Sequence, residues 1–144
     1  MKKYGASKLL YSGIVAKVNR RYVVQNRKMI ITDEAIYNID IDSDEIRRRI
    51  PIVAIDGIAV SQMRDGFFVL RVPEEYDYLH VSAQKTEIIK CIMDQYKKLT
   101  GKNLPLHVDN KLVYSPYHKS KGKGVRTIEF KEDNKIKIPT ILLT

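Results

Sequence analysis

One segment of this chain, residues 82–101, has a clear helical repeat, and it limits the folds that the rest can adopt. Its apolar residues recur every three or four positions, which is the spacing of one face of an α-helix. They are Ile88, Ile92, Tyr96 and Leu99, with Ile89 and Met93 beside them. Ser82 can cap the start of this helix, and Gly101 can end it. We therefore predict one amphipathic helix that covers the open end or a face of a sheet.

The rest of the first hundred residues predicts short strands separated by turns. In residues 27–40, two apolar segments flank Asp33-Glu34, which is a tight polar turn. Pro51 is expected to end its strand or to confine it to a sheet edge. About seven strands are predicted, in the segments 11–19, 27–33, 35–40, 41–52, 55–62, 63–72 and 73–82. Seven short antiparallel strands closed by one helix form the pleckstrin-homology architecture, as a barrel or a sandwich.

The last part of the chain adds to this pattern. Residues 106–114 and 125–133 each read as a further strand, and residues 115–124 between them read as a mobile basic loop. We predict that residues 1–144 form a single domain. Its pleckstrin-homology-like core spans about residues 10–101, and residues 102–144 form a C-terminal β extension.

The net charge of +9 is concentrated at the two ends of the chain. Residues 1–32 contain eight lysines and arginines and no acid. Residues 33–110 contain ten bases and fourteen acids, and residues 111–144 contain eight bases and three acids. A fold that brings the two ends to one side would form a basic face that attracts a polyanion. Phosphorylated lipid head groups and nucleic acid are the two obvious candidates.

Five bases surround the first predicted hairpin with no acid among them. Lys17 lies on the first strand and Arg27 begins the second, so the two can approach each other at the open end of the sheet. Arginine offers a planar fork to phosphate oxygens, and lysine offers a compact charge. We predict an anion-binding site that consists of Lys17, Arg20, Arg21, Arg27 and Lys28. The alternative is a solvated basic loop that only keeps the domain soluble.

Two other basic segments have less specific interpretations. Arg47, Arg48 and Arg49 follow a run of acids and are interpreted as a salt-bridged surface, with Arg48 on the face opposite to the other two. A second basic patch in the 115–124 loop suits an anionic membrane or is simply a flexible connection. It contains Lys119, Lys121 and Lys123.

Catalysis, metal binding and membrane spanning have little support. Cys91 falls within the predicted helix, and no P-loop motif is present. Asp40, Asp42 and Asp44 have the spacing of a calcium loop, but Glu45 and Pro51 stand where that loop needs glycine and glutamate. No apolar run reaches the roughly 18–20 residues of a membrane span. We expect no enzyme, no cofactor, no metal site and a cytoplasmic location.

The order of several motifs resembles a known family. The segments "KVNRRYVVQNRKMIITDEAIYNID", "RRRIPIVAIDGIAVSQMRDGFFVLRV" and "DYLHVSAQKTEII" are similar to the tail homology one domain of class I myosins, and "SPYHKSKGKGVRTIEF" resembles its basic C-terminal portion. The resemblance implies a pleckstrin-homology-like fold that binds phosphoinositides and other anionic phospholipids, such as phosphatidylserine, on the cytosolic face of membranes. The lysine and arginine of the family's lipid-binding signature match Lys17 and Arg27. Tyr22 stands in the hairpin loop where the family often has glycine.

Two alternatives remain for the partner. Pleckstrin-homology-like folds also host peptide sites, and class I myosin tails contact cytoskeletal partners, so a protein-interaction module for actin or an adaptor is the second hypothesis. An exposed edge strand or an apolar groove would favour it. Nucleic acid is not expected, because no RNA- or DNA-reading motif accompanies the sequence pI of about 9.6.

Overall fold

The computed structural model describes residues 7–61, 65–117, 125–132 and 137–143. These ranges contain one α-helix, α1 (Lys85–Thr100), a short 3-10 helix, η2 (Ile52–Ala54), and eleven strands. The strands are β1 (Leu9–Val18), β2 (Val24–Thr32), β3 (Ala35–Asp40), β4 (Ile46–Pro51), β5 (Gly57–Val60), β6 (Phe67–Arg71), β7 (Tyr78–Val81), β8 (Leu106–Val108), β9 (Lys111–Tyr114), β10 (Arg126–Glu132) and β11 (Lys137–Leu143). The described part is therefore mostly β-sheet.

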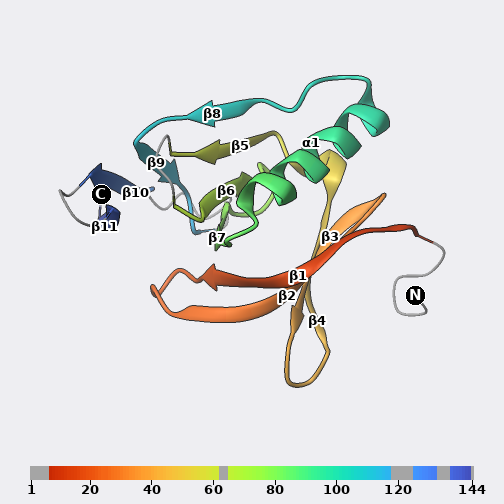
Figure 1. Ribbon diagram of the computed structural model, residues 1–144, viewed down its shortest axis with the longest axis horizontal. Helices are drawn as coiled ribbons and strands as arrows, with labels where there is room; N and C mark the ends of the chain where they lie inside the picture. The colour runs from red at the N-terminus through yellow and green to blue at the C-terminus, as the bar shows by residue number, and fades with distance from the viewer. Residues whose placement is uncertain (1–6, 62–64, 118–124, 133–136, 144) are drawn as a thin grey trace.

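Eight strands form one sheet in the order β4-β3-β2-β1-β7-β6-β5-β8. Strand β1 pairs with β2 along its whole length, but with β7 only through Ala16–Val18. The sheet divides at this short contact into two layers, and α1 lies across their open end (Figure 1). Strands β4 and β8 end the order, so the described sheet is a sandwich and not a closed barrel.

The predicted elements of the core are confirmed. Each of the seven predicted strand segments overlaps one of the strands β1 to β7, although β1 begins at Leu9 and β2 at Val24, before their predicted starts, and the predicted helix contains α1. Asp33 and Glu34 form the two-residue connection between β2 and β3, where the Thr32 hydroxyl accepts backbone N–H bonds from Glu34 and Ala35 at 3.2 Å each. Strand β4 ends at Pro51 and lies at a sheet edge, as expected for a residue without a backbone N–H.

The helix differs from its sequence pattern at its N-cap and along its apolar face. Gly101 ends it as predicted, with φ of 75° and an N–H bond to the Lys97 carbonyl at 2.8 Å. The N-cap, however, is Gln84 and not the predicted Ser82. The Ser82 hydroxyl instead accepts the Gln84 N–H at 3.0 Å in the turn before the helix. Leu99 is 44% exposed, whereas Gln95 is buried and donates to the Asp33 carbonyl at 2.7 Å. The polar bond docks the end of α1 on the β2–β3 turn.

The C-terminal extension corrects one prediction. Residues 106–114 are not a single strand, because the Asp109 carboxylate accepts the Lys111 N–H at 3.2 Å and turns the chain between β8 and β9. Strand β8 joins the main sheet parallel to β5, whereas β9 begins a second sheet in the order β11-β10-β9. Strand β11 had no counterpart in the predicted strands. Of the predicted loop 115–124, residues 118–124 lie outside the described residues.

Two apolar clusters hold these parts together. The larger cluster fills the space between the two layers and α1, with Phe68, Ile88 and Ile92 among its fully buried members. The second lies on the opposite face of the sheet, where Leu112, Tyr114 and Ile128 of the extension pack on Val18, Val69 and Leu79. The extension therefore shares buried surface with β1, β6 and β7. Within the described residues, no helix is long and apolar enough to cross a membrane.

Candidate functional site

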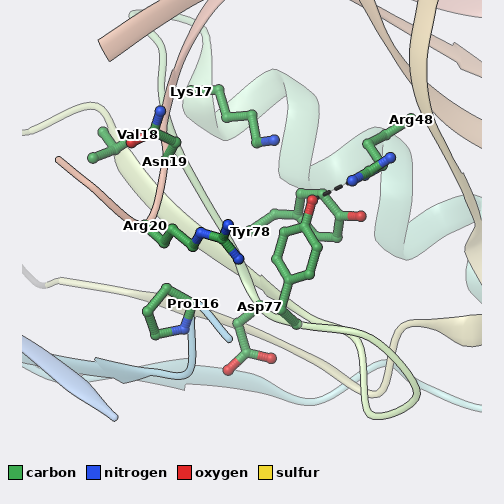
Figure 2. A pocket seen from close by; sticks show the side chains of 9 residues that line it. Lys17, Val18, Asn19, Arg20, Arg48, Asp77, Tyr78 and Pro116 are labelled. Carbon is green, nitrogen blue, oxygen red and sulfur yellow. Dashed lines mark hydrogen bonds between the residues drawn. The ribbon is translucent and has the colours of Figure 1, made fainter. Parts of the chain in front are cut away.

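A pocket of about 380 Å³ opens at one end of the sandwich (Figure 2). Its walls come from β1 and the β1–β2 loop, from β4, from the β6–β7 connection and β7, and from the segment after β9. The lining residues are Lys17, Val18, Asn19, Arg20, Arg48, Tyr76, Asp77, Tyr78 and Pro116. Three of these nine residues are cations, so the pocket is suited to an anion.

Strand register explains why cations from separate strands meet here. Lys17 follows Val15 by two positions, so it continues the core-facing side of β1. Arg48 precedes Ile50 by two positions on β4 in the same way, and Arg27 lies opposite Val15 on β2. Each of these strands thus begins or ends its apolar inner face with a base.

Lys17 is the most enclosed of the pocket cations. Its ammonium lies 5.7 Å from the centroid of the Tyr76 ring and 5.4 Å from that of the Tyr78 ring. Burial lowers the pKa of Lys17, and the positive charges of Arg48 and Arg27 lower it further. The three bases therefore repel one another across the pocket, and an anion placed among them would relieve that repulsion.

Arg48 is the residue of this pocket that our sequence interpretation placed elsewhere. Its Nε donates to the Tyr76 hydroxyl at 2.9 Å, and its guanidinium lies 5.8 Å from the Tyr76 ring centroid. Arg47 and Arg49 form the predicted salt-bridged surface, with Asp40 at 3.2 Å and Glu34 at 3.8 Å respectively. The alternation of faces along β4 was the signal that separates Arg48 from its neighbours.

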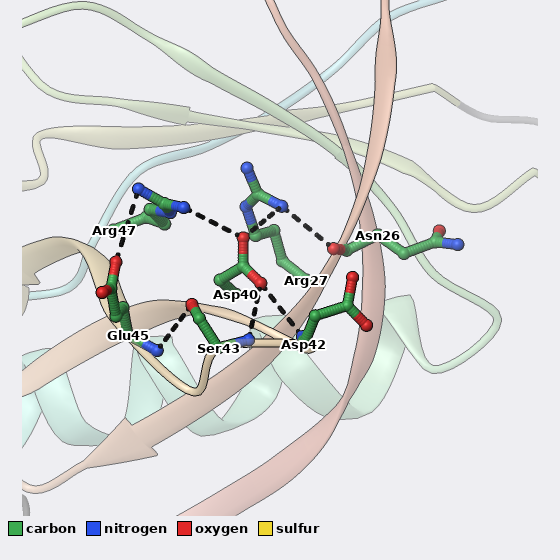
Figure 3. Close-up of polar contacts among 7 residues, drawn as sticks. All are labelled: Asn26, Arg27, Asp40, Asp42, Ser43, Glu45 and Arg47. Atoms are coloured by element: carbon green, nitrogen blue, oxygen red, sulfur yellow. Dashed lines mark hydrogen bonds and ion pairs between the residues drawn. The ribbon is translucent and has the colours of Figure 1, made fainter.

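Arg27 lies beside the pocket and not in its lining. Its Nη1 is 4.0 Å from the Asp40 carboxylate, which is also paired with Arg47 (Figure 3). Asp40 accepts the backbone N–H groups of Asp42 and Ser43 at 3.0 and 3.1 Å. The hydrogen bond from Ser43 and the pairing with Arg47 lower the Asp40 pKa. The acidic loop therefore forms a turn and partly neutralises Arg27.

The other predicted site residues are divided between the pocket and its surroundings. Arg20 lines the pocket, and Figure 2 shows its guanidinium pointing toward Tyr78. Arg21 is exposed in the β1–β2 loop, where its backbone N–H donates to the Asn19 side chain at 2.8 Å. Lys28 pairs with Ile14 and Ile39 on the face of β2 that points away from the pocket. Lys119, Lys121 and Lys123 lie outside the described residues.

One acid, Asp77, lines the pocket, but backbone groups engage its carboxylate. It accepts the N–H of Val72 at 3.3 Å and that of Ser115 at 2.9 Å. The Asp77 N–H in turn donates to the Ser115 carbonyl at 2.7 Å. Asp77 thereby fixes the segment after β9 against the pocket wall.

A buried histidine lies beneath the pocket cations. His80 on β7 is paired with Lys17 in the strand register and contacts the Asn38 amide on β3 at 3.2 Å. Its ring stacks with Phe68 of β6 and with Tyr78. Burial, together with the Lys17 charge, lowers the His80 pKa from its ordinary 6.5 to about 3. His80 is therefore a neutral part of the core at physiological pH.

This pKa predicts a pH dependence of stability. The unfolded chain takes up a proton on His80 below about pH 6.5, whereas the folded chain does so only near pH 3. The contribution of neutral His80 to the free energy of unfolding is complete above pH 6.5 and is lost as the pH falls toward 3. The free energy of unfolding falls by at most about 1.4 kcal/mol per pH unit for this one group. Urea unfolding at several pH values would measure it. The slope should shrink in a His80→Leu variant but not in an exposed control, His107→Gln, and equal slopes in all three proteins would contradict it.

The fold and this basic pocket define a pleckstrin-homology-like domain. The C-terminal pleckstrin-homology domain of human pleckstrin superposes with a TM-score of 0.57 at 19% identity, covering 67% of this chain and 86% of that one. The hSac2 domain from human phosphoinositide phosphatase Sac2 superposes with a TM-score of 0.56 at 13% identity, covering 76% and 83%. These likenesses establish the fold alone.

Sequence comparison identifies the family. A family model described as an unconventional myosin tail, actin- and lipid-binding, matches residues 1–141, so the chain belongs to this family. Myosin IA heavy chain of Dictyostelium discoideum is 31% identical over 108 residues, which are 69% of this chain and 11% of that protein. Myosin ID heavy chain of the same organism is 29% identical over 142 residues, which are 89% and 12%. The predicted resemblance to class I myosin tails is confirmed, and the chain spans roughly a tenth of the length of these relatives.

Proposed function

We propose that this chain is a peripheral membrane-binding module that recognises anionic phospholipids, phosphoinositides in particular, through the basic pocket at its first hairpin. The observation that carries the proposal is the convergence on one pocket of Lys17 and Arg20, from the end of β1 and the loop after it, with Arg48 from β4. Arg27 adds its charge from the side, as its effect on the Lys17 pKa indicates. The family description as lipid-binding supports the same class of ligand.

The chemistry of the pocket suits a phosphorylated ring. Arg48 and Arg20 would each offer several N–H donors to phosphate oxygens, and Lys17 would supply a point charge between them. The phenol rings of Tyr76 and Tyr78 form an apolar wall that leaves the charges only partly hydrated, which strengthens their interaction with an anion. Arg21 in the loop would add long-range attraction to an anionic surface. Non-specific electrostatic attraction would also come from Lys28, Lys119, Lys121 and Lys123.

The setting follows from the same proposal. The chain would act as a binding module without a chemical step and would attach reversibly to the cytosolic face of a membrane. A head-group pocket and a general basic surface together provide the two signals that stable peripheral attachment needs. In a longer protein, the module would bring whatever precedes it, such as a motor domain, to that membrane.

Vesicle co-sedimentation at physiological salt tests this function. The vesicles would carry either phosphatidylserine alone or a phosphoinositide at equal total charge. We expect the phosphoinositide vesicles to bind the chain about tenfold more tightly, because a built pocket reads the arrangement of phosphates and not only their number. Equal binding would leave only a charge-reading surface, and absence of binding to both would contradict the proposal.

A second candidate function is the binding of actin or a cytoskeletal adaptor, which the family description includes. The favouring observation is a groove of about 460 Å³ between α1 and the β5–β8 edge, with Val60, Ile89, Met93 and Leu106 among its lining residues. Strand β8 is exposed at that edge of the sheet. Co-sedimentation with filamentous actin in the absence of lipid separates this function from the first.

A further inference from the structure

The C-terminal extension contacts the same hairpin loop that carries the pocket bases. Arg126, the first residue of β10, is only 6% exposed although it is charged. Its guanidinium donates a hydrogen bond to the main-chain carbonyl of Arg20. The same group stacks on the Tyr22 ring at 4.0 Å from the ring centroid and lies 5.7 Å from that of Tyr117. One side chain thus joins β10 to the loop across more than a hundred residues of sequence.

The loop needs such support because its backbone is unfavourable on its own. Tyr22 has φ of 64°, in the left-handed region that residues with a side chain other than Asn, Asp or His rarely occupy. Asn19 supports the turn locally, since its side chain accepts the N–H of Arg21 and of Val23. Arg126 stacks on the ring of the strained residue itself, and this cation–π contact favours the bent loop over extended alternatives.

Arg126 is placed to act through the loop and not on a ligand. It does not line the pocket, and its Nη1 is buried without a hydrogen-bond partner. The residue that it holds, Arg20, does line the pocket. Pro116, also of the extension, lines the pocket near Arg20 in Figure 2, so the extension contacts both the pocket and the loop that carries Arg20.

We propose that Arg126 is a positioning residue: by holding the Arg20 carbonyl and the Tyr22 ring, it fixes the loop so that the Arg20 guanidinium stays in the pocket. This inference rests on the proposed head-group site. It makes the C-terminal extension part of the lipid-recognition machinery and makes selectivity for a phosphorylated head group depend on β10. Attraction to a merely anionic surface does not depend on it, because that attraction needs no fixed geometry.

The first measurement uses vesicles with Arg126→Gln in the full chain. We expect the preference for phosphoinositide over phosphatidylserine at equal charge to fall about tenfold, since Arg20 must then be ordered at the moment of binding. Lys111→Gln is the matched control, because it removes one positive charge from an exposed position on the neighbouring strand β9. An equal change of preference in both variants, or no change in Arg126→Gln, would overturn the proposal.

The second measurement needs no lipid. It therefore tests whether Arg126 holds the hairpin loop, independently of whether the proposed lipid-binding function is correct. Trypsin cleaves after arginine, and the carbonyl that Arg126 holds belongs to the Arg20–Arg21 bond. We expect this bond to be cut about tenfold faster in Arg126→Gln than in wild type or Lys111→Gln. An unchanged rate of cleavage after Arg20 would refute the positioning role of Arg126, even if lipid binding were selective.

Variants of Tyr22 keep the proposal testable if Arg126→Gln does not fold. Tyr22→Phe retains the ring and removes only a hydroxyl that has no hydrogen-bond partner, so it should behave as wild type in both measurements. Tyr22→Ala removes the stacking surface. It should therefore show the same reduced phosphoinositide preference and the same faster cleavage after Arg20 as Arg126→Gln. Equal behaviour of the two Tyr22 variants would overturn the role of the stack.

Discussion

Replacing Lys17 and Arg48 together by methionine is expected to weaken binding to phosphoinositide vesicles by more than about 100-fold. Each residue would lose a charge-assisted hydrogen bond to phosphate, and such bonds contribute about 1.5–3 kcal/mol each. Two of them correspond to at least about 3 kcal/mol, or more than two decades in the dissociation constant. The binding isotherm of the double variant, compared with wild type, measures the loss.

The fold should tolerate this double change. Lys17 and Arg48 both contact Tyr76, and their positive charges repel each other. Methionine removes this repulsion and keeps an unbranched side chain in place of each aliphatic stem. The melting temperature is therefore expected to stay within a few degrees of wild type.

The matched control is Arg47→Met with Arg49→Met. These two arginines lie on the same strand and carry the same total charge, but they pair with Asp40 and Glu34 and do not line the pocket. We expect them to reduce binding less than about threefold, because exposed pairs contribute little and charge far from the pocket is screened. Equal losses in the two double variants would show that net charge, and not the pocket, governs binding.

The sequence was informative wherever one local pattern decides the structure. Alternation and turn residues predicted the seven strands of the core, and the 3.6-residue repeat predicted α1, because a buried face requires those periods. The hairpin bases were visible as an unneutralised cluster, and two of them, Lys17 and Arg20, line the pocket.

The missing site residues depend on contacts between distant segments. The sequence placed Arg48 on the face opposite to Arg47 and Arg49, but only the fold shows that this face meets Tyr76 and lines the pocket. Tyr76 and Pro116 reach the pocket through the fold of β7 and the extension, which no local pattern describes. Gln95 reads as a polar interruption of a helical stripe, yet its partner is a carbonyl 62 residues away. Long-range register, and not residue type, decides these placements.

The same kind of long-range contact bears on domain organisation. The sequence predicted one domain with a core and an added extension, and we propose that the extension is energetically part of the core. Leu112 of β9 is 1% exposed and packs in the cluster that contains Val18 of the site-bearing strand β1. Two units that share a buried cluster of this kind are expected to unfold together.

Leu112→Ala is therefore expected to destabilise the whole chain by about 2–4 kcal/mol, the usual cost of removing a buried leucine side chain. The adjacent Val113 is 41% exposed, so Val113→Ala is the control and should change the free energy of unfolding by less than about 1 kcal/mol. Urea unfolding followed by far-ultraviolet circular dichroism should give one transition that shifts as a whole in Leu112→Ala, because β1, β6 and β7 lose a packing partner together with β9. A separate early transition, with the main one unchanged, would mean that the extension folds independently of the sandwich. Arg126 of β10 would then hold the hairpin loop only while that weaker unit stayed folded. Lipid selectivity would be lost at a lower urea concentration than the one that unfolds the core.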